Sequence, residues 1–217
     1  MDTFTIGPYT LEGFVGPQDA PLIYLLGEPD QGDSLWPHLR DRCTLITVTG
    51  LRWNQDLSPW PAPKVFSQGE DLSGGGDQFL KILLEELLPQ AEARFSPFPK
   101  VRGLVGYSLA GLFALYACTQ TGYFSHVASV SGSLWYPGFV DYLQTHSPAD
   151  GTKIYLSLGD RESHSRNQTM AQVERCTQQA RGLLSNTCPV IYEQNPGGHF
   201  YQVPQRIVQG ITRLLDL

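Results

Sequence analysis

The chain has 217 residues, a length that predicts one medium-sized domain spanning residues 1–217. Apolar residues make up 41 % of the chain and charged residues only 17 %, a balance that favours a globular protein over a disordered one. With 15 basic and 21 acidic residues the formal charge is −6, so we expect the protein to bind neither nucleic acid nor an anionic membrane surface.

The sequence predicts no targeting signal and no membrane span. Residues 1–10 contain no basic cluster and no apolar run of signal-peptide length, and no later stretch reaches about 18 uninterrupted apolar residues. The four cysteines, at positions 43, 118, 176 and 188, form no C-x-x-C pair. We therefore expect a soluble, cytoplasmic protein with reduced, mostly buried thiols and neither a zinc site nor a disulfide framework.

Short apolar runs recur along the chain and predict its strands. They lie at 9–15, 21–26, 43–49, 101–107, 126–130, 153–158 and 189–192. Most of them lack the alternation of a strand with one solvated face, which is typical of strands buried on both faces of a mainly parallel sheet.

Between these runs lie patterns typical of helices. The segment 77–89 has one leucine-rich face, with Asp77 as its expected N-cap and Pro89 as its end. Further helices are expected over 109–121, within 170–184 and from about Pro204 onward, and the Pro-rich segment 58–63 is expected to be a rigid surface loop. The alternation of strand and helix predicts an α/β fold with helices on both faces of the sheet.

Ligands in such folds bind beyond the carboxyl ends of the strands, so residues just after each apolar run are candidates for function. The first candidate is the segment from Gly106 to Gly111, which reads GYSLAG between a predicted strand and a predicted helix. It resembles the G-x-S-x-G nucleophile elbow, with Ala110 in place of the last glycine. The alternative is a turn of small residues in which Ser108 only caps the helix.

Two further strand ends carry suitable partners for a nucleophile. Asp160 and Glu162 follow the strand 153–158, and His199 follows Gly197 and Gly198 after the last strand. Acids in loops are most often only solvated. Serine, acid and histidine nevertheless occur in the chain order of the α/β-hydrolase triad, which differs from the chymotrypsin and subtilisin orders. The sequence therefore predicts a serine hydrolase in which Ser108 attacks and His199 transfers the proton.

The chain also resembles a known family, the esterases related to enterobactin and salmochelin trilactone esterases, feruloyl esterases and esterase D, within the α/β-hydrolase superfamily. The matching features extend from about residue 20 to 203. They are LIYLLG from Leu22, GGGDQFL from Gly74, GYSLAGLFALYA from Gly106, SGSLWY from Ser131 and GGHF from Gly197. The resemblance implies an α/β-hydrolase fold and ester hydrolysis. The short connections after Ser131 and Gly159 predict that there is no large lid, and we expect no cofactor or metal.

The resemblance also bears on the acid. Family members tend to carry it about three residues after the glycine that ends the strand, which implies Glu162 rather than Asp160. Some relatives use a Ser-His dyad, so the acid stays the open member of the triad.

The tetrahedral oxyanion needs two hydrogen-bond donors. The elbow geometry provides the amide of Leu109, at the N-terminus of the following helix. The second donor is expected after the early strand, at Gly27 or Glu28. The family commonly has Asp-Gly in that loop, and this chain departs from the pattern.

Several residues are candidates for substrate binding. Tyr107 and Trp135 are expected to contact the substrate, in an aromatic wall that could also include the loop residues Trp36, Trp53 and Phe200. Arg52 could bind a substrate carbonyl or anion, or it could pair with Asp56. Short connections after the strands predict an open cleft for a water-soluble, small-molecule ester.

Three alternative functions stay open at this stage. A thioesterase, acyltransferase or peptidase would use the same three residues, and a catalytically silent member of the fold would serve as a binding module. A metal hydrolase is the weakest alternative, because Asp160, Glu162 and His164 lack a recognised ligand spacing.

Overall fold

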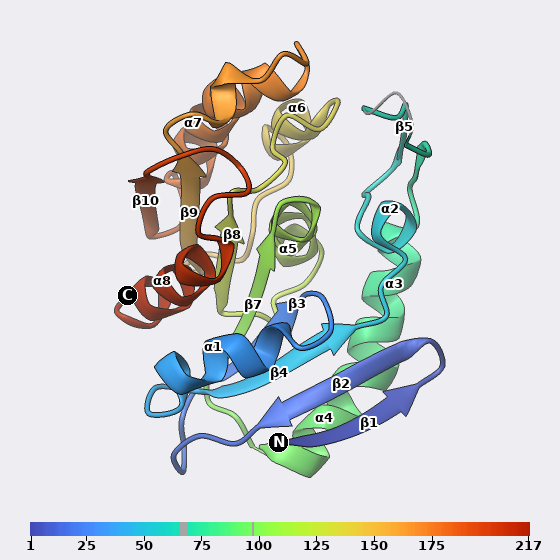
Figure 1. Cartoon of the computed structure of the whole chain (residues 1–217), viewed down its shortest axis with the longest axis vertical. Helices are drawn as coiled ribbons and strands as arrows, with labels where there is room; N and C mark the ends of the chain where they lie inside the picture. Colours follow the sequence, from blue (N-terminus) through green and yellow to red (C-terminus); the bar gives the residue numbers. More distant parts are fainter. Residues whose placement is uncertain (66–68, 97) are drawn as a thin grey trace.

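The computed structural model describes residues 1–65, 69–96 and 98–217. Within them, eight strands form one sheet in the order β1-β2-β4-β3-β7-β8-β9-β10 (Figure 1). β1 and β2 run antiparallel to their neighbours, and the strands from β4 to β10 are parallel. The predicted mainly parallel sheet is confirmed. The strands are β1 Asp2–Ile6, β2 Tyr9–Phe14, β3 Leu22–Leu26, β4 Thr44–Thr49, β7 Arg102–Tyr107, β8 His126–Val130, β9 Lys153–Gly159 and β10 Val190–Asn195.

Helices cover both faces of this sheet, as predicted (Figure 1). One apolar cluster joins a face of the sheet to α1 and α8, and a larger cluster joins the opposite face to the helices α3 to α7. The helices are α1 Gln31–Leu39, α2 Trp53–Asp56, α3 Gly76–Ile82, α4 Leu88–Phe95, α5 Leu109–Gln120, α6 Phe139–Leu143, α7 Val173–Leu184 and α8 Val203–Leu215. Single 3₁₀ turns lie at Glu162–His164 and Met170–Gln172, and the short strands β5 Pro61–Ala62 and β6 Leu72–Ser73 pair with each other.

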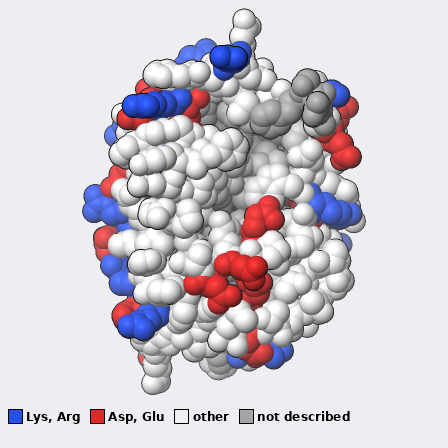
Figure 2. Space-filling view, in the orientation of Figure 1, with Lys and Arg blue, Asp and Glu red and all other residues white. Residues whose placement is uncertain are grey.

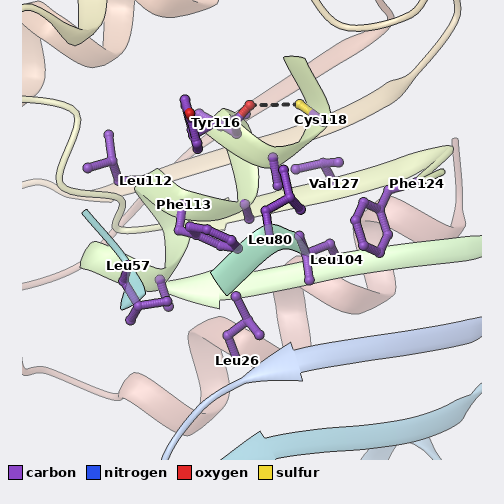
Figure 3. Packing of buried hydrophobic residues seen from close by; sticks show 14 of the residues in the cluster. Leu26, Leu57, Leu80, Leu104, Leu112, Phe113, Tyr116, Cys118, Phe124 and Val127 are labelled. Carbon is purple, nitrogen blue, oxygen red and sulfur yellow. Dashed lines mark hydrogen bonds between the residues drawn. The ribbon is translucent and has the colours of Figure 1, made fainter. Parts of the chain in front are cut away.

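The helix α5 lies at the centre of the larger cluster. Its residues from Leu109 to Cys118 are all buried, which agrees with the apolar pattern on every side of the predicted helix. Figure 3 shows Phe113 of α5 among Leu57, Leu80 and Leu104, which come from three other parts of the chain. Burying each such side chain contributes about 2 kcal/mol, so α5 is held rigidly against the sheet.

The helix predicted over 77–89 differs from the prediction at both ends. It begins at Gly76, and Asp77 is not its cap: the Asp77 carboxylate accepts a hydrogen bond from the hydroxyl of Tyr116. At the other end Pro89 does not stop the helical path, which continues through α4. A π-helical turn at Leu83–Leu87 precedes the proline. Because proline lacks an amide hydrogen and clashes with the preceding turn, this wider turn lets the helical path pass it.

Other parts of the fold escaped the sequence analysis. β1 is a mostly exposed edge strand, and α1 contains Pro37, so neither has a strong apolar pattern. The segment 58–63 is only partly a surface loop. Trp60 packs against Tyr142 at a ring-centroid distance of 5.3 Å and donates a hydrogen bond of 2.9 Å to the carbonyl of Pro137.

The four cysteines are free and buried, as expected from their spacing. Among the described residues, no helix combines the length and the apolar character that crossing a membrane would require.

A polar cluster connects α4 to the sheet. The carboxylate of Glu92 accepts hydrogen bonds from the hydroxyls of Tyr24 and Tyr123, at 3.0 and 2.6 Å, and from two nitrogens of Arg102, at 2.7 and 2.8 Å. Burial raises the pKa of Glu92, but these hydrogen bonds outweigh burial, and the pKa lies below its usual value. The ionised carboxylate is therefore the form that stabilises the fold.

We expect Glu92→Gln to lower the free energy of unfolding at pH 7 by about 2 kcal/mol, because an amide nitrogen cannot accept the hydrogen bonds that a carboxylate oxygen accepts. The folded-state pKa of Glu92 is lowered, so the stability it contributes is present at neutral pH and is lost as the pH falls through that pKa. Urea unfolding at pH 7 and below pH about 4 measures this, and the difference from wild type should shrink at the lower pH.

Glu85→Gln is the matched control, because Glu85 lies 63 % exposed in the same helical path, 4.0 Å from Lys81. We expect it to change stability by less than about 0.5 kcal/mol. An equal loss in the two variants would contradict a special role for the Glu92 cluster.

The turn from β7 into α5 depends on a close backbone contact. A Cβ atom at Gly106 would lie 2.2 Å from the carbonyl carbon and oxygen of Ala110 and 2.7 Å from the nitrogen of Gly111. These are backbone atoms of a buried helix and cannot move aside. The missing side chain at residue 106 therefore lets the helix begin directly above the strand.

Gly106→Ala should lower the free energy of unfolding by more than about 3 kcal/mol, because the added methyl group would overlap the backbone of α5. Gly182→Ala is the control: a Cβ at this position in α7 meets nothing within 4 Å, and alanine should raise stability by up to about 1 kcal/mol. Thermal unfolding of both variants measures the difference, and a wild-type midpoint for Gly106→Ala would refute the contact argument.

Candidate active site

Ser108 lies in the turn between β7 and α5. Its backbone has φ 58° and ψ −121°, a left-handed conformation that is rare for residues other than glycine. The amide of Ser108 donates a hydrogen bond of 3.1 Å to the carbonyl of Val130 on β8, and its carbonyl accepts from Leu112 at 3.1 Å. These contacts hold the serine hydroxyl above the carboxyl edge of the sheet. Its left-handed turn argues against a simple N-capping serine, which has extended backbone.

His199 lies between Ser108 and Glu162. Its Nε2 is 3.0 Å from the Oγ of Ser108, and its Nδ1 is 2.7 Å from Oε2 of Glu162. These distances fit a proton on Nδ1 donated to the carboxylate and a serine hydroxyl that donates to Nε2. The structure thus brings together three side chains that lie 91 and 37 residues apart in the chain.

Glu162 lies on the 3₁₀ turn after β9, with its side chain only 3 % exposed. Its Oε1 accepts a hydrogen bond of 2.7 Å from the amide of Gly159. Burial raises the pKa of this carboxyl, but the hydrogen bond from His199 and that from Gly159 outweigh it, and the pKa lies below its usual value. Asp160 has another role: it accepts a hydrogen bond of 2.7 Å from the amide of Gly197, in the turn that carries His199.

The predicted oxyanion donors have different surroundings. Leu109 begins α5, and amides in the first turn of a helix have no acceptor within the helix. The Gly27 prediction is wrong, because the Gly27 amide donates to the carbonyl of Val48 as part of the sheet, at 3.1 Å. The Glu28 amide lies outside the sheet and donates to an exposed side chain, Oε1 of Gln31, at 3.2 Å. Its role as an oxyanion donor stays a prediction.

A hollow of about 250 Å³ opens beside Ser108 and His199. Figure 2 shows a depression near the middle of this face, with uncharged surface on its left side and acidic side chains directly below it. Its lining is mostly apolar and aromatic: Trp53, Val65, Leu72, Leu109, Trp135, Met170 and Phe200. Glu70 and His199 are the titratable side chains among the described residues that line it.

The candidate substrate-binding residues lie in several places. Trp135 lines the hollow, together with Trp53 and Phe200, whereas Trp36 lies in α1 against Phe14, at a ring-centroid distance of 5.5 Å. The expectation that Trp36 lies in a loop of the aromatic wall is wrong, because the residue lies in α1 and packs half-buried against the core cluster on that face.

Tyr107 and Arg52 do not line the hollow either. Tyr107 is buried, and its hydroxyl donates a hydrogen bond to the backbone carbonyl of His199, so the predicted substrate contact is replaced by support of the histidine turn. Burial raises the pKa of Tyr107, which keeps this donor protonated. Arg52 forms an ion pair of 2.9 Å with Asp56, which is the alternative that the sequence left open.

Two further residues lie near the triad, and neither has a sequence signal that assigns it a role. The Oγ of Ser133 lies 3.3 Å from that of Ser108, and the guanidinium of Arg206 lies 2.9 Å from Oε1 of Glu162. Ser133 was part of the SGSLWY motif but carried no assigned role. Arg206 had no sequence signal beyond a basic residue inside an apolar helical pattern.

The metal-hydrolase alternative finds no support in the parts of the chain that the structure describes. No group of three histidine, cysteine, aspartate or glutamate side chains there is arranged to hold a metal ion.

Comparisons with known proteins identify a family and similar folds. A family described as "Putative esterase" matches residues 42–202. Among curated proteins, YbbA of Bacillus subtilis (strain 168) is 27 % identical over 133 residues, which cover 59 % of this chain and 53 % of YbbA. The match thus spans about half the length of that relative.

Two solved structures share the fold. An IroE-like serine hydrolase from Shewanella oneidensis has a TM-score of 0.78 and 17 % identity, over 96 % of this chain and 75 % of that one. The siderophore hydrolase EstA from Aspergillus nidulans has a TM-score of 0.67 and 19 % identity, over 96 % and 90 % of the two chains. At such identities these structures show the α/β-hydrolase fold alone. The family match covers most of the chain, and the chain therefore belongs to the family described as "Putative esterase".

Proposed function

We propose that this protein hydrolyses a carboxylic ester through a covalent acyl intermediate on Ser108. The observation that carries the proposal is the continuous series of short contacts from Ser108 Oγ to His199 Nε2, at 3.0 Å, and from His199 Nδ1 to Glu162 Oε2, at 2.7 Å. Both distances lie within the reach required of a nucleophile, a general base and the group that orients the base.

In the first half of the reaction the Oγ of Ser108 forms a bond to the ester carbonyl carbon while its proton moves to Nε2 of His199. The tetrahedral intermediate collapses, the bond from carbon to the alcohol oxygen breaks, and the alcohol leaves with the proton from His199. Water then attacks the acyl-serine and loses a proton to His199. When the second tetrahedral intermediate collapses, the bond from the acyl carbon to Oγ breaks, His199 returns the proton to Oγ, and the carboxylic acid leaves. Glu162 accepts a hydrogen bond from Nδ1 throughout and stabilises the imidazolium.

The negative charge on the tetrahedral oxygen needs a donor at the start of α5. The amide of Leu109 follows the nucleophile directly and stands at a helix N-terminus. A donor of this kind contributes on the order of 3 kcal/mol to transition-state stabilisation. Because it is a backbone group, its position depends on the turn at Gly106 rather than on a side chain.

Ser108→Ala should lower kcat for a p-nitrophenyl ester by about 10³-fold or more, because the nucleophile is lost, while circular dichroism stays that of the wild type. A fluorophosphonate probe should label wild type on the peptide that contains Ser108. This labelling separates a serine hydrolase from a silent binding module of the same fold.

Ser133→Ala is the control for labelling, because its hydroxyl lies only 3.3 Å from that of Ser108. We expect the Ser133→Ala protein to be labelled and the Ser108→Ala protein not to be. Turnover that persists in Ser108→Ala, or a label found on Ser133, would contradict the assignment of the nucleophile. Parallel assays with oxygen esters, thioesters and amides distinguish an esterase from a thioesterase or a peptidase.

The lining of the hollow also supports a substrate class. Aromatic and aliphatic side chains surround it, and the described lining residues include no lysine or arginine. A pocket of about 250 Å³ is smaller than most sites that enclose a drug-sized ligand. We therefore propose that it receives one uncharged, apolar arm of the ester. EstA is a siderophore hydrolase by its name, and a large siderophore would extend beyond this hollow.

We expect kcat/KM for p-nitrophenyl hexanoate to exceed that for the mono-p-nitrophenyl ester of adipic acid by about tenfold or more, because the second ester ends in a carboxylate that the pocket cannot pair. Glu70→Gln should lower the ratio of kcat/KM for the hexanoate ester to that for the adipate ester. Glu70 lines the hollow, and its negative charge repels the carboxylate of the adipate ester. Glu85→Gln, on the exposed surface of the π-helical turn between α3 and α4, serves as the control. A preference for the anionic ester would overturn this substrate class without affecting the role of Ser108.

A further inference from the structure

Arg206 is a charged residue in an unusual place. It lies in the first turns of α8 with its side chain only 2 % exposed. Its Nη1 donates a hydrogen bond of 2.9 Å to Oε1 of Glu162, the carboxylate oxygen that does not contact His199. The same Nη1 lies 3.0 Å from the Oγ of Ser131. The acid of the site is thus held from both sides, by an imidazole at one oxygen and a guanidinium at the other.

The second nitrogen of the guanidinium contacts the turn that carries His199. Nη2 of Arg206 donates to the carbonyl of Pro196 at 2.7 Å and to that of Gly198 at 3.0 Å. One buried side chain therefore joins the acid and the histidine turn, which follow different strands. The planar, forked geometry of a guanidinium suits this arrangement, and a single ammonium group could not reach all of these acceptors.

The strand end is shaped to admit this guanidinium. A Cβ atom at Gly159 would lie 2.7 Å from Nη2 of Arg206 and 2.3 Å from the carbonyl oxygen of Gly197. Only a glycine leaves room there for both groups. Gly159 also donates its amide to Glu162, so the same residue supports the carboxylate and makes room for its cation.

The contact with Arg206 affects the charge state of the buried Glu162 carboxyl. Burial is the largest single influence on the Glu162 carboxyl, and by itself it favours the neutral acid. A neutral acid would no longer stabilise an imidazolium at His199. A buried carboxylate and a buried guanidinium in direct contact neutralise each other, whereas either one alone would carry a large desolvation penalty.

We infer that Arg206 is a positioning residue of the esterase reaction, which holds the Glu162 carboxylate ionised and turned toward His199. It touches neither the hollow nor Ser108 and acts through the acid. The hydrogen bonds from Arg206 to the carbonyls of Pro196 and Gly198 are assigned to the stability of the fold and not to catalysis. The inference rests on the proposed function, since it assigns a role within that reaction.

The experiment is a double-mutant cycle on a p-nitrophenyl ester with wild type, Arg206→Gln, Glu162→Gln and the double variant. Arg206→Gln should lower kcat by about 30-fold and change KM by less than about twofold, because the residue lies outside the substrate hollow. In the Glu162→Gln background the same substitution should lower kcat by less than about threefold, since the carboxylate through which it acts is gone.

Two further variants complete the test. Arg206→Lys keeps the charge beside Glu162 and should recover part of the kcat lost in Arg206→Gln. Arg213→Gln removes a half-exposed arginine of the same helix, which pairs with Glu193, and should leave kcat unchanged. If Arg206→Gln fails to fold by circular dichroism, the cycle is run with Arg206→Lys, whose loss of kcat should likewise largely vanish in the Glu162→Gln background.

Equal losses of kcat in the two backgrounds would overturn the inference, because Arg206 would then act independently of Glu162. A loss that appears mainly in KM would overturn it as well. Neither of these two results contradicts the proposed function, provided that the fluorophosphonate labels Ser108. If wild type neither turns over an ester nor is labelled, the proposed function fails and the inference fails with it.

Discussion

The close contact between β7 and α5 is the constraint on which the candidate site depends. Because residue 106 has no Cβ, the backbone of Ala110 can approach the backbone of Gly106 more closely than any side chain at residue 106 would allow. The chain then has to reverse within one residue, and Ser108 takes the left-handed conformation. A helix this near the sheet is enclosed on nearly every side, which explains why α5 is apolar all round.

The order of the strands brings the other groups to the same edge. From β7 to β10 the spatial order follows the sequence order, so the turns after successive strands are neighbours. The turns after β7, β9 and β10 supply Ser108, Glu162 and His199. The turn after β8 lies between them, and it supplies Ser133 beside the nucleophile and Ser131 beside Arg206. A parallel sheet therefore assembles a polar site from residues that are distant in the chain.

Much of this could be predicted from the sequence because it rests on local signals. Buried parallel strands give continuous apolar runs, and glycines within two residues of Ser108 and His199 mark turns that need small residues. Elements with weak patterns were missed, as the edge strand β1 and the proline-containing α1 show. Pro89 was interpreted as a helix end because its local effect is to break a helix, and the π turn that accommodates it has no comparable sequence signal.

Residue roles that depend on distant partners could not be predicted. Tyr107 and Arg52 are both adjacent to strand ends, and nothing local distinguishes a side chain that faces a substrate from one that contacts a carbonyl 92 residues away or an acid four residues away. Gly27 is a similar case, since its amide belongs to a hydrogen bond with the neighbouring strand. In each case the partner decides the role, and the partner is known only from the fold.

The buried pair of Glu162 and Arg206 links the site to the completion of the fold. α8 is the last helix of the chain, and it docks on the sheet through Ile207, Ile211 and Leu214. Docking this apolar face also buries Arg206. Burying its charge is unfavourable unless the guanidinium pairs with a carboxylate. Glu162 in turn is costly to bury as an anion without a cation nearby. Because each charge makes the burial of the other tolerable, we expect the ionised Glu162 carboxylate and the docked helix α8 to stabilise each other.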